Sequence, residues 1–155
     1  MRAFVFVAAG ARYALDASCI QAVHPLVRAR AVPGAPTWLR GVIDVHGEMV
    51  PCVDASQLLA QAPSSQTLGS RVLLVDTGTA EGLTRARFAL VVDRVLDPVQ
   101  LELDGAWRSG SGAVPWLGSV VAHQGHAAQV FDPGMLAQAH RQLEAQDTPL
   151  GEVQA

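Results

Sequence analysis

Residues 41–55 read GVIDVHGEMVPCVDA, and this stretch decides the fold because a diverged copy of it occurs later in the chain. Two short apolar runs flank a His-Gly pair, and the second run ends in Val-Asp. Apolar runs on either side of a glycine-containing turn are typical of a β-hairpin. Trp38 and Leu39 precede this hairpin, and the same pair recurs 78 positions later as Trp116 and Leu117.

The similarity extends along both hairpins and predicts an internal duplication. At the same offset the identical pairs are Val42 and Val120, Gly47 and Gly125, Asp54 and Asp132, and Leu58 and Leu136. Upstream, the residues RYAL at 12–15 resemble RFAL at 87–90, at an offset of 75. Each copy is therefore expected to contain about five strands and to end in an Asp that caps a helix.

The predicted fold is all-β, with two small five-stranded β-barrel lobes that share a hydrophobic core. Residues 72–75 and 88–92 are apolar on both faces, so both strands must be covered on two sides. A five-stranded unit of roughly 70 residues is small for independent stability, which favours two units that bury a common seam. The third strand of each copy is expected at residues 20–23 and 95–99.

The chain is interpreted as one domain over residues 1–155. A short C-terminal helix is predicted at about 133–145, because apolar residues recur there at helical spacing. These apolar residues are Met135, Leu136, Ala139 and Leu143. Residues 146–155 are expected to form a flexible tail.

Composition excludes several classes of function. The formal net charge is only −3, and charged residues make up 16% of the chain, so no basic field for nucleic acid or an anionic membrane is expected. No apolar stretch approaches the length of a membrane span, and the N-terminal run alternates as a strand does, unlike a secretory signal. We therefore expect a cytoplasmic protein without direct membrane insertion. Cys19 and Cys52 lie in apolar stretches and are interpreted as buried, reduced thiols.

No arrangement of residues predicts catalysis. Asp44 and His46 have the spacing of some metal ligands, but His123 and His126 belong to the other hairpin, so no metal is expected. Cys52 has neither a cation nor a helix start beside it in the sequence, which argues against a nucleophile. Phosphate-binding glycine motifs are missing from the sequence. The prediction is a protein that is not an enzyme and has no cofactor.

The same residues resemble the CheW family of chemotaxis coupling proteins. The motifs that carry the resemblance are RYALD at 12–16, PGAPTWLRGVIDVHG at 33–47, VPCVD at 50–54 and FALVVDRV at 88–95. The resemblance extends from about Phe4 to Leu143. It implies two five-stranded barrels on one core and a non-catalytic scaffold. The implied partners are a CheA-type histidine kinase, bound through a regulatory domain of the same fold, and the cytoplasmic tip of a methyl-accepting chemoreceptor.

By position in the family pattern, six residues are candidates for the receptor-binding side, whereas the kinase contacts are not assigned. These candidates are Ile20, Ala22, Gly41, Val42, Asp44 and His46. Two of them depart from the family: His46 replaces the Arg of an N-x-R-G motif, and Ala22 replaces a Glu. The D-x-H-G form is similar to CheW-like proteins of Wsp-type surface-sensing systems, which control cyclic-di-GMP and biofilm formation.

A second class of function stays open at this point. A small-molecule-sensing module could be built on duplicated barrels, with a pocket lined by Trp38 or Trp116. Packing of these tryptophans at the seam between the lobes is the alternative interpretation of the same residues.

Overall fold

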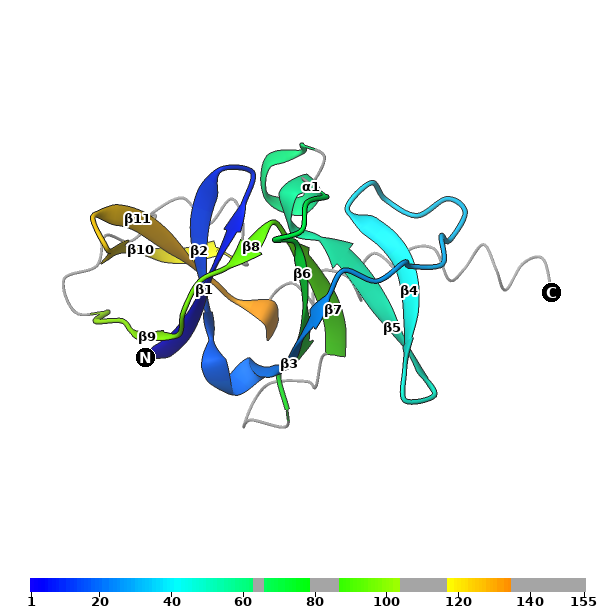
Figure 1. Cartoon of the computed structure of the whole chain (residues 1–155), viewed down its shortest axis with the longest axis horizontal. Helices are drawn as coiled ribbons and strands as arrows, with labels where there is room; N and C mark the ends of the chain where they lie inside the picture. Colours follow the sequence, from blue (N-terminus) through cyan, green and yellow to red (C-terminus); the bar gives the residue numbers. More distant parts are fainter. Residues whose placement is uncertain (63–65, 79–86, 104–116, 135–155) are drawn as a thin grey trace.

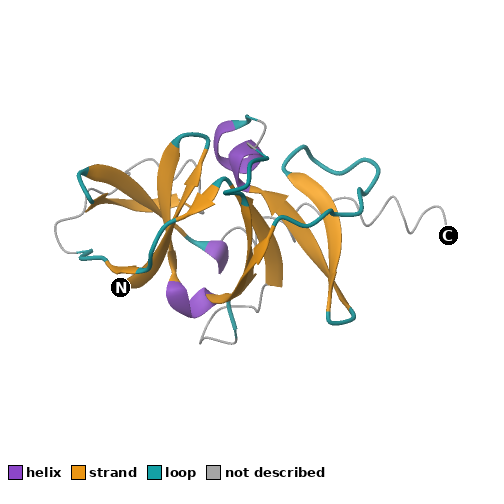
Figure 2. Ribbon diagram, viewed as in Figure 1, coloured by secondary structure: helices purple, strands orange, loops and turns teal. Residues whose placement is uncertain are grey.

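The computed structural model describes residues 1–62, 66–78, 87–103 and 117–134. In these residues strands dominate, and they form two sheets with one short α-helix at the surface (Figures 1 and 2). The all-β prediction is therefore confirmed.

The first copy of the repeat supplies the strands that precede the helix. They are β1 (Arg2–Ala8), β2 (Ala11–Asp16), β3 (Ile20–Pro25), β4 (Leu39–Val45) and β5 (Glu48–Asp54). A single 3-10 turn, Ala17–Cys19, joins β2 to β3, and helix α1 (Ala55–Ala60) follows β5. The predicted order of elements is thus present in this copy.

The second copy supplies the remaining strands. They are β6 (Arg71–Asp76), β7 (Arg87–Val92), β8 (Arg94–Val95), β9 (Val99–Gln100), β10 (Leu117–His123) and β11 (His126–Phe131). The stretch predicted as a third strand, 95–99, is divided between β8 and β9. Pro98 lies between the two pieces and has no backbone N–H to donate to a neighbouring strand.

The two copies exchange strands. One sheet has the order β10-β11-β2-β1-β8, with β9 also paired to β1, and the other has the order β3-β6-β7-β5-β4. Each sheet therefore combines the first two strands of one copy with later strands of the other. In Figure 1 the blue β1 and β2 lie beside the yellow and orange β10 and β11, while the green β6 and β7 lie beside β5.

The register of the exchanged strands is the same in both lobes. Ala14 on β2 is paired in parallel with Val130 on β11, and Ala89 on β7 is paired in parallel with Cys52 on β5. Ala14 and Ala89 are related by the offset of 75, and Cys52 and Val130 by the offset of 78. The duplication seen in the sequence is therefore also a duplication of the strand pairing.

The lobes are more open than the predicted barrels. β3 and β4 lie at opposite ends of their sheet and do not pair with each other. The chain that follows β3 crosses to β4 instead, where Arg30 and Val42 exchange two backbone hydrogen bonds of 2.9 Å. A single bridge thus replaces the ladder of hydrogen bonds that would close this barrel.

One hydrophobic core joins the two sheets, as the sequence predicted. It contains Phe6 and Phe131 from one sheet together with Leu73 and Leu90 from the other, all of them at most 1% exposed. The rings of Phe6 and Phe131 meet edge to face with centroids 6.2 Å apart. A smaller cluster lies within the first sheet and is formed by Ala3, Val5, Ala14, Leu101, Val121 and Ala128.

Aspartates cap the helical segments that follow the two hairpins. Asp54 is the N-cap of α1 and accepts hydrogen bonds from the backbone N–H groups of Ser56 and Gln57. Asp132 accepts a hydrogen bond of 3.0 Å from the N–H of Gly134. The rest of the predicted helix over 133–145, the tail over 146–155 and Trp116 lie outside the described residues.

Candidate functional site

The β4–β5 hairpin has a turn whose geometry follows from its sequence. His46 and Gly47 both have positive φ, at 51° and 85°, as a type I′ turn requires. Asp44 accepts a hydrogen bond of 2.7 Å from the N–H of Gly47. The matching turn of the other hairpin, at Gln124 and Gly125, has φ values of 50° and 77°. His46 is therefore an exposed turn residue, held in place by its backbone.

The six residues predicted for receptor binding do not share one environment. Asp44 and His46 are exposed, whereas Ile20, Ala22 and Val42 are partly buried. Ile20 and Ala22 pack from β3 against the shared core. Gly41 is buried, so it can influence a partner only through the backbone around it.

The position of Gly41 in the structure requires glycine, for two reasons. Its φ is +140°, in the region that favours glycine. A Cβ at this position would overlap the carbonyl oxygen of Arg30 and would lie 2.5 Å from the carbonyl carbon. The close approach of the Arg30 backbone to β4 therefore depends on glycine at this position.

A groove of about 450 Å³ lies beside the exposed hairpin residues, between β4 and the chain that follows β3. We call it the β3–β4 groove. It is lined by His24, Val27 and Arg28, by residues 43–46, and by Val72 and Leu74. The groove brings Asp44 and His46 together with residues from the other edge of the sheet. Its walls combine charged and apolar side chains, which suits it to contact another protein.

Sequence reasoning missed His24, Val27 and Arg28 as members of this surface. In the sequence these residues are visible only as a mixture of arginines and valines over residues 27–32, and it is the structure that shows Val27 to be 41% exposed. Single exposed apolar residues are common on protein surfaces, so this mixture alone does not mark a contact surface, whereas the shared groove of Val27 and Arg28 does. The prediction placed no functional residue there.

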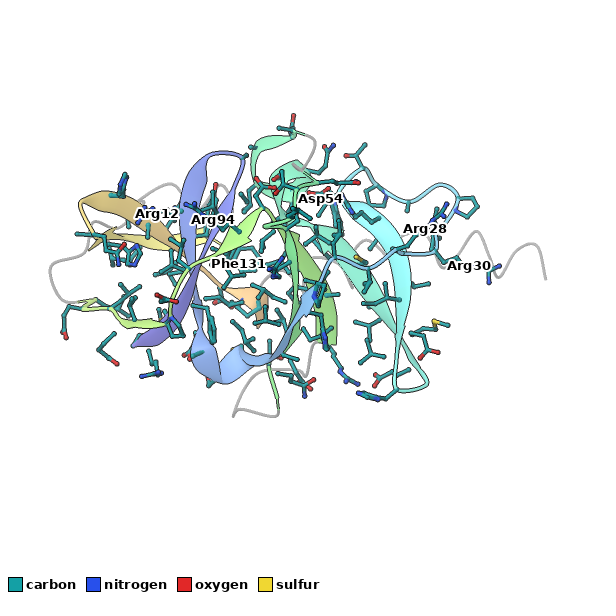
Figure 3. All side chains as sticks on the ribbon, in the orientation of Figure 1. Arg12, Arg28, Arg30, Asp54, Arg94 and Phe131 are labelled. Atoms are coloured by element: carbon teal, nitrogen blue, oxygen red, sulfur yellow. The ribbon has the colours of Figure 1, made fainter. Side chains whose placement is uncertain are left out.

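Arg40 on β4 forms an ion pair with the buried carboxylate of Asp54. The pairing of β4 with β5 shifts between Leu39 and Gly41, which interrupts the alternation of the strand. Arg40 donates from Nε to Oδ2 of Asp54 over 3.2 Å. This ion pair connects β4 to the N-terminus of α1, so Arg40 supports the hairpin (Figure 3 labels Asp54).

The other polar residues meet the requirements of neither metal binding nor nucleophilic chemistry over residues 1–62, 66–78, 87–103 and 117–134. Among the residues that the structure describes, no group of three or more His, Cys, Asp and Glu converges. Cys19 and Cys52 are both free thiols. Burial raises the pKa of the Cys52 thiol to about 11, although the nearby Arg40 acts in the opposite direction. Cys52 therefore stays protonated and unreactive near neutral pH.

The raised pKa of Cys52 gives a direct test. In the native protein at pH 7.5 we expect an aromatic disulfide reagent to label the partly exposed Cys19 slowly, because burial raises the pKa of this thiol too, and to leave the fully buried Cys52 unmodified until denaturant is added. Labelling would be followed by absorbance and located by mass spectrometry. A Cys19→Ser variant serves as the control and should show no labelling before unfolding. Modification of Cys52 in this folded variant would contradict the environment described above.

His123 occupies the position in β10 that Val45 occupies in β4. It is 4% exposed, and its Nδ1 lies 2.9 Å from Nη1 of Arg12. Because a guanidinium can only donate, Nδ1 accepts this hydrogen bond and the ring proton belongs to Nε2. Burial, followed by the charge of Arg12 and the nearby His126, lowers the pKa of His123. The imidazole is therefore neutral in the folded protein at physiological pH.

The fold defines the class of protein: a duplicated β protein in which two lobes exchange strands, pair them in the same register and share one core. The chain belongs to the CheW-like domain family, whose sequence pattern matches residues 2–141. Its structure is similar to the crystal structure of the scaffolding protein TtCheW from Thermoanaerobacter tengcongensis, with a TM-score of 0.72 and 18% sequence identity. That similarity covers 87% of this chain and 90% of the other.

Comparison with curated proteins finds no significant match. Within the described ranges, no helix has both the length and the apolar character needed to cross a bilayer.

Proposed function

We propose that this chain is a non-catalytic cytoplasmic adaptor of a chemosensory array. It couples the cytoplasmic tip of a methyl-accepting chemoreceptor to the regulatory domain of a CheA-type histidine kinase. The observation that carries this proposal is membership of the CheW-like family over residues 2–141. The adaptor is held at the membrane only through the receptors that it binds.

The open lobe supports a binding function because it presents groups that a partner can contact without any reaction. The β3–β4 groove provides a concave surface, and β3 and β4 are edge strands of their sheet. Edge strands and grooves are common sites for protein contacts. Transient contacts of this kind bury on the order of 1,000 Å² or less, and an array adds avidity over many such contacts.

On the receptor side we propose the hairpin residues Asp44 and His46 as direct contacts, because both are exposed beside the groove. Partly buried apolar surface is contributed by Ile20, Ala22 and Val42. Gly41 contributes indirectly, because it allows the backbone of Arg30 to approach β4 closely. His46 and Ala22 replace an Arg and a Glu of the family pattern, and the loss of both residues favours a matched change in the receptor surface.

We further propose that the pathway is of the Wsp type, with cyclic-di-GMP synthesis and biofilm formation as its output. The D-x-H-G turn and Ala22 support this assignment. The arrangement of neighbouring genes tests it: a receptor, a CheA-like kinase and a diguanylate cyclase are expected beside this gene. A set of flagellar genes in place of the cyclase would favour swimming chemotaxis.

The adaptor role is tested by co-sedimentation of the full chain with a receptor cytoplasmic fragment and the kinase regulatory domain. A His46→Glu substitution is expected to weaken receptor binding about tenfold, because it places a carboxylate at the edge of the contact surface. The matched control is Gln124→Glu, which introduces the same charge at the equivalent turn of the other hairpin. This control should bind the receptor as the wild type does.

Circular dichroism would show that both variants are folded. Equal receptor affinity of the His46→Glu variant and the wild type would remove His46 from the contact. A wild-type protein that binds neither partner would refute the adaptor role and would favour the small-molecule-sensing module instead. A ligand for such a module would raise the melting temperature in a metabolite screen.

A further inference from the structure

We propose that the connection after β3, residues 26–32, is a docking surface for an acidic amphipathic helix of a protein partner. This inference deepens the proposed adaptor function, since it gives the chemistry of the partner's surface. It rests on the charge of the connection, on the two hollows beside it and on the way in which its backbone is held.

The charge of this region differs from that of the rest of the chain. The whole chain has a formal net charge of −3, yet no Asp or Glu occurs between Asp16 and Asp44. The cations of this stretch are Arg28, Arg30 and Arg40. Asp44 adds one exposed carboxylate to the lining of the β3–β4 groove, so the excess positive charge lies on the connection itself, at the exposed Arg28 and Arg30, where it favours an anionic partner.

Two of these arginines are available to a partner. Arg40 is engaged with Asp54, as described above. The side chains of Arg28 and Arg30 are exposed, and neither makes a hydrogen bond or an ion pair with any other residue in the described part of the chain. Figure 3 labels both arginines on the connection that passes across β4.

Hollows on both sides of the connection add apolar surface to this charge. The β3–β4 groove of about 450 Å³ lies on one side, and a second hollow of about 600 Å³ is lined by residues that include Leu26 and Ala29. Val27 and Arg28 line both hollows. Val27 and Val32 are 41% and 43% exposed. A helix with an apolar stripe and flanking carboxylates matches this combination.

The backbone of the connection is held in place before a partner arrives. Arg30 exchanges two hydrogen bonds with Val42, and the Arg30 carbonyl lies against Gly41, where a side chain would not fit. A fixed backbone loses little conformational entropy on binding, so the arginines act as a preorganised pair. An anionic membrane is a weaker candidate because polybasic membrane anchors use clusters of roughly four to eight cations.

The test uses a fluorescein-labelled synthetic peptide of 18 residues, an amphipathic helix of Leu, Ala and Glu, and its counterpart with Gln in place of Glu. Binding to the full chain is measured by fluorescence anisotropy at 50 mM and 300 mM salt. The double variant Arg28→Ser/Arg30→Ser should lower the affinity for the Glu peptide about tenfold at low salt. The difference should shrink at high salt because exposed charges are screened.

The matched control is the double variant Arg2→Ser/Arg94→Ser, which removes two exposed arginines from the other lobe. It should bind the Glu peptide as the wild type does. The inference would be overturned if the wild type bound the Glu and Gln peptides with equal affinity, or if it did not bind the Glu peptide. It would also be overturned if the two double variants lost the same amount of affinity for the Glu peptide. So would binding to phosphatidylserine vesicles through Arg28 and Arg30 without peptide binding.

Binding to a receptor cytoplasmic fragment, measured with the same variants, separates this inference from the proposed function. If the wild type and the Arg28→Ser/Arg30→Ser variant bind the receptor and the kinase domain equally, the adaptor role stands and the docking surface is wrong. If the wild type binds the Glu peptide but neither protein, the docking surface stands and the adaptor role fails.

Discussion

A Gly41→Ala substitution is expected to lower the free energy of unfolding by about 4 kcal/mol. The added Cβ would overlap the carbonyl oxygen of Arg30, and it would also place a side chain at a φ of +140°. Relief of the overlap requires the connection after β3 to move away from β4, which breaks the pair of hydrogen bonds between Arg30 and Val42. Urea unfolding followed by circular dichroism measures the loss.

The control for this prediction is Gly34→Ala in the same connection. Gly34 also has a positive φ, +79°, but a Cβ there would meet no atom within 4 Å. Its loss should therefore be only about 1 kcal/mol, the conformational cost alone. Equal losses in the two variants would show that the approach of Arg30 to Gly41 does not contribute to stability.

A Phe131→Ala substitution is expected to cost about 4 kcal/mol, because it removes a buried ring and leaves a cavity between the two sheets. Phe131 is 1% exposed and packs edge to face on Phe6. Since the core extends across both sheets, the variant should still unfold in one transition, with the same midpoint by circular dichroism and by tryptophan fluorescence.

Val130→Ala provides the comparison, because Val130 is the neighbouring residue on β11 and is only partly buried. Its cost should be close to 1 kcal/mol. Two separate transitions in the Phe131→Ala variant would mean that the lobes are independent units with a weak contact. A cost no larger than that of Val130→Ala would mean that the ring does not contribute to a shared core.

The candidate site was predictable only in part. The position of His46 in a hairpin turn followed from the His-Gly pair, since the turn type depends on neighbouring residues alone. The importance of His24 and Arg28 could not be predicted, because the groove that joins them to Asp44 forms between two edges of a curved sheet. Gly41 was identified as a candidate, but its contact with Arg30 requires the path of the connection to be known.

The sequence by itself determined the duplication, the order of the strands within each copy, the hairpin turns and the Asp54 cap. All of these depend on short-range features: residue periodicity, glycine at positive φ, and an acid placed before a helix. The tertiary structure alone decided which strands lie side by side, including the exchange that pairs β2 with β11 and β7 with β5. Strands that are apolar on both faces can pair with many neighbours, so their partners are selected by long-range packing around the common core.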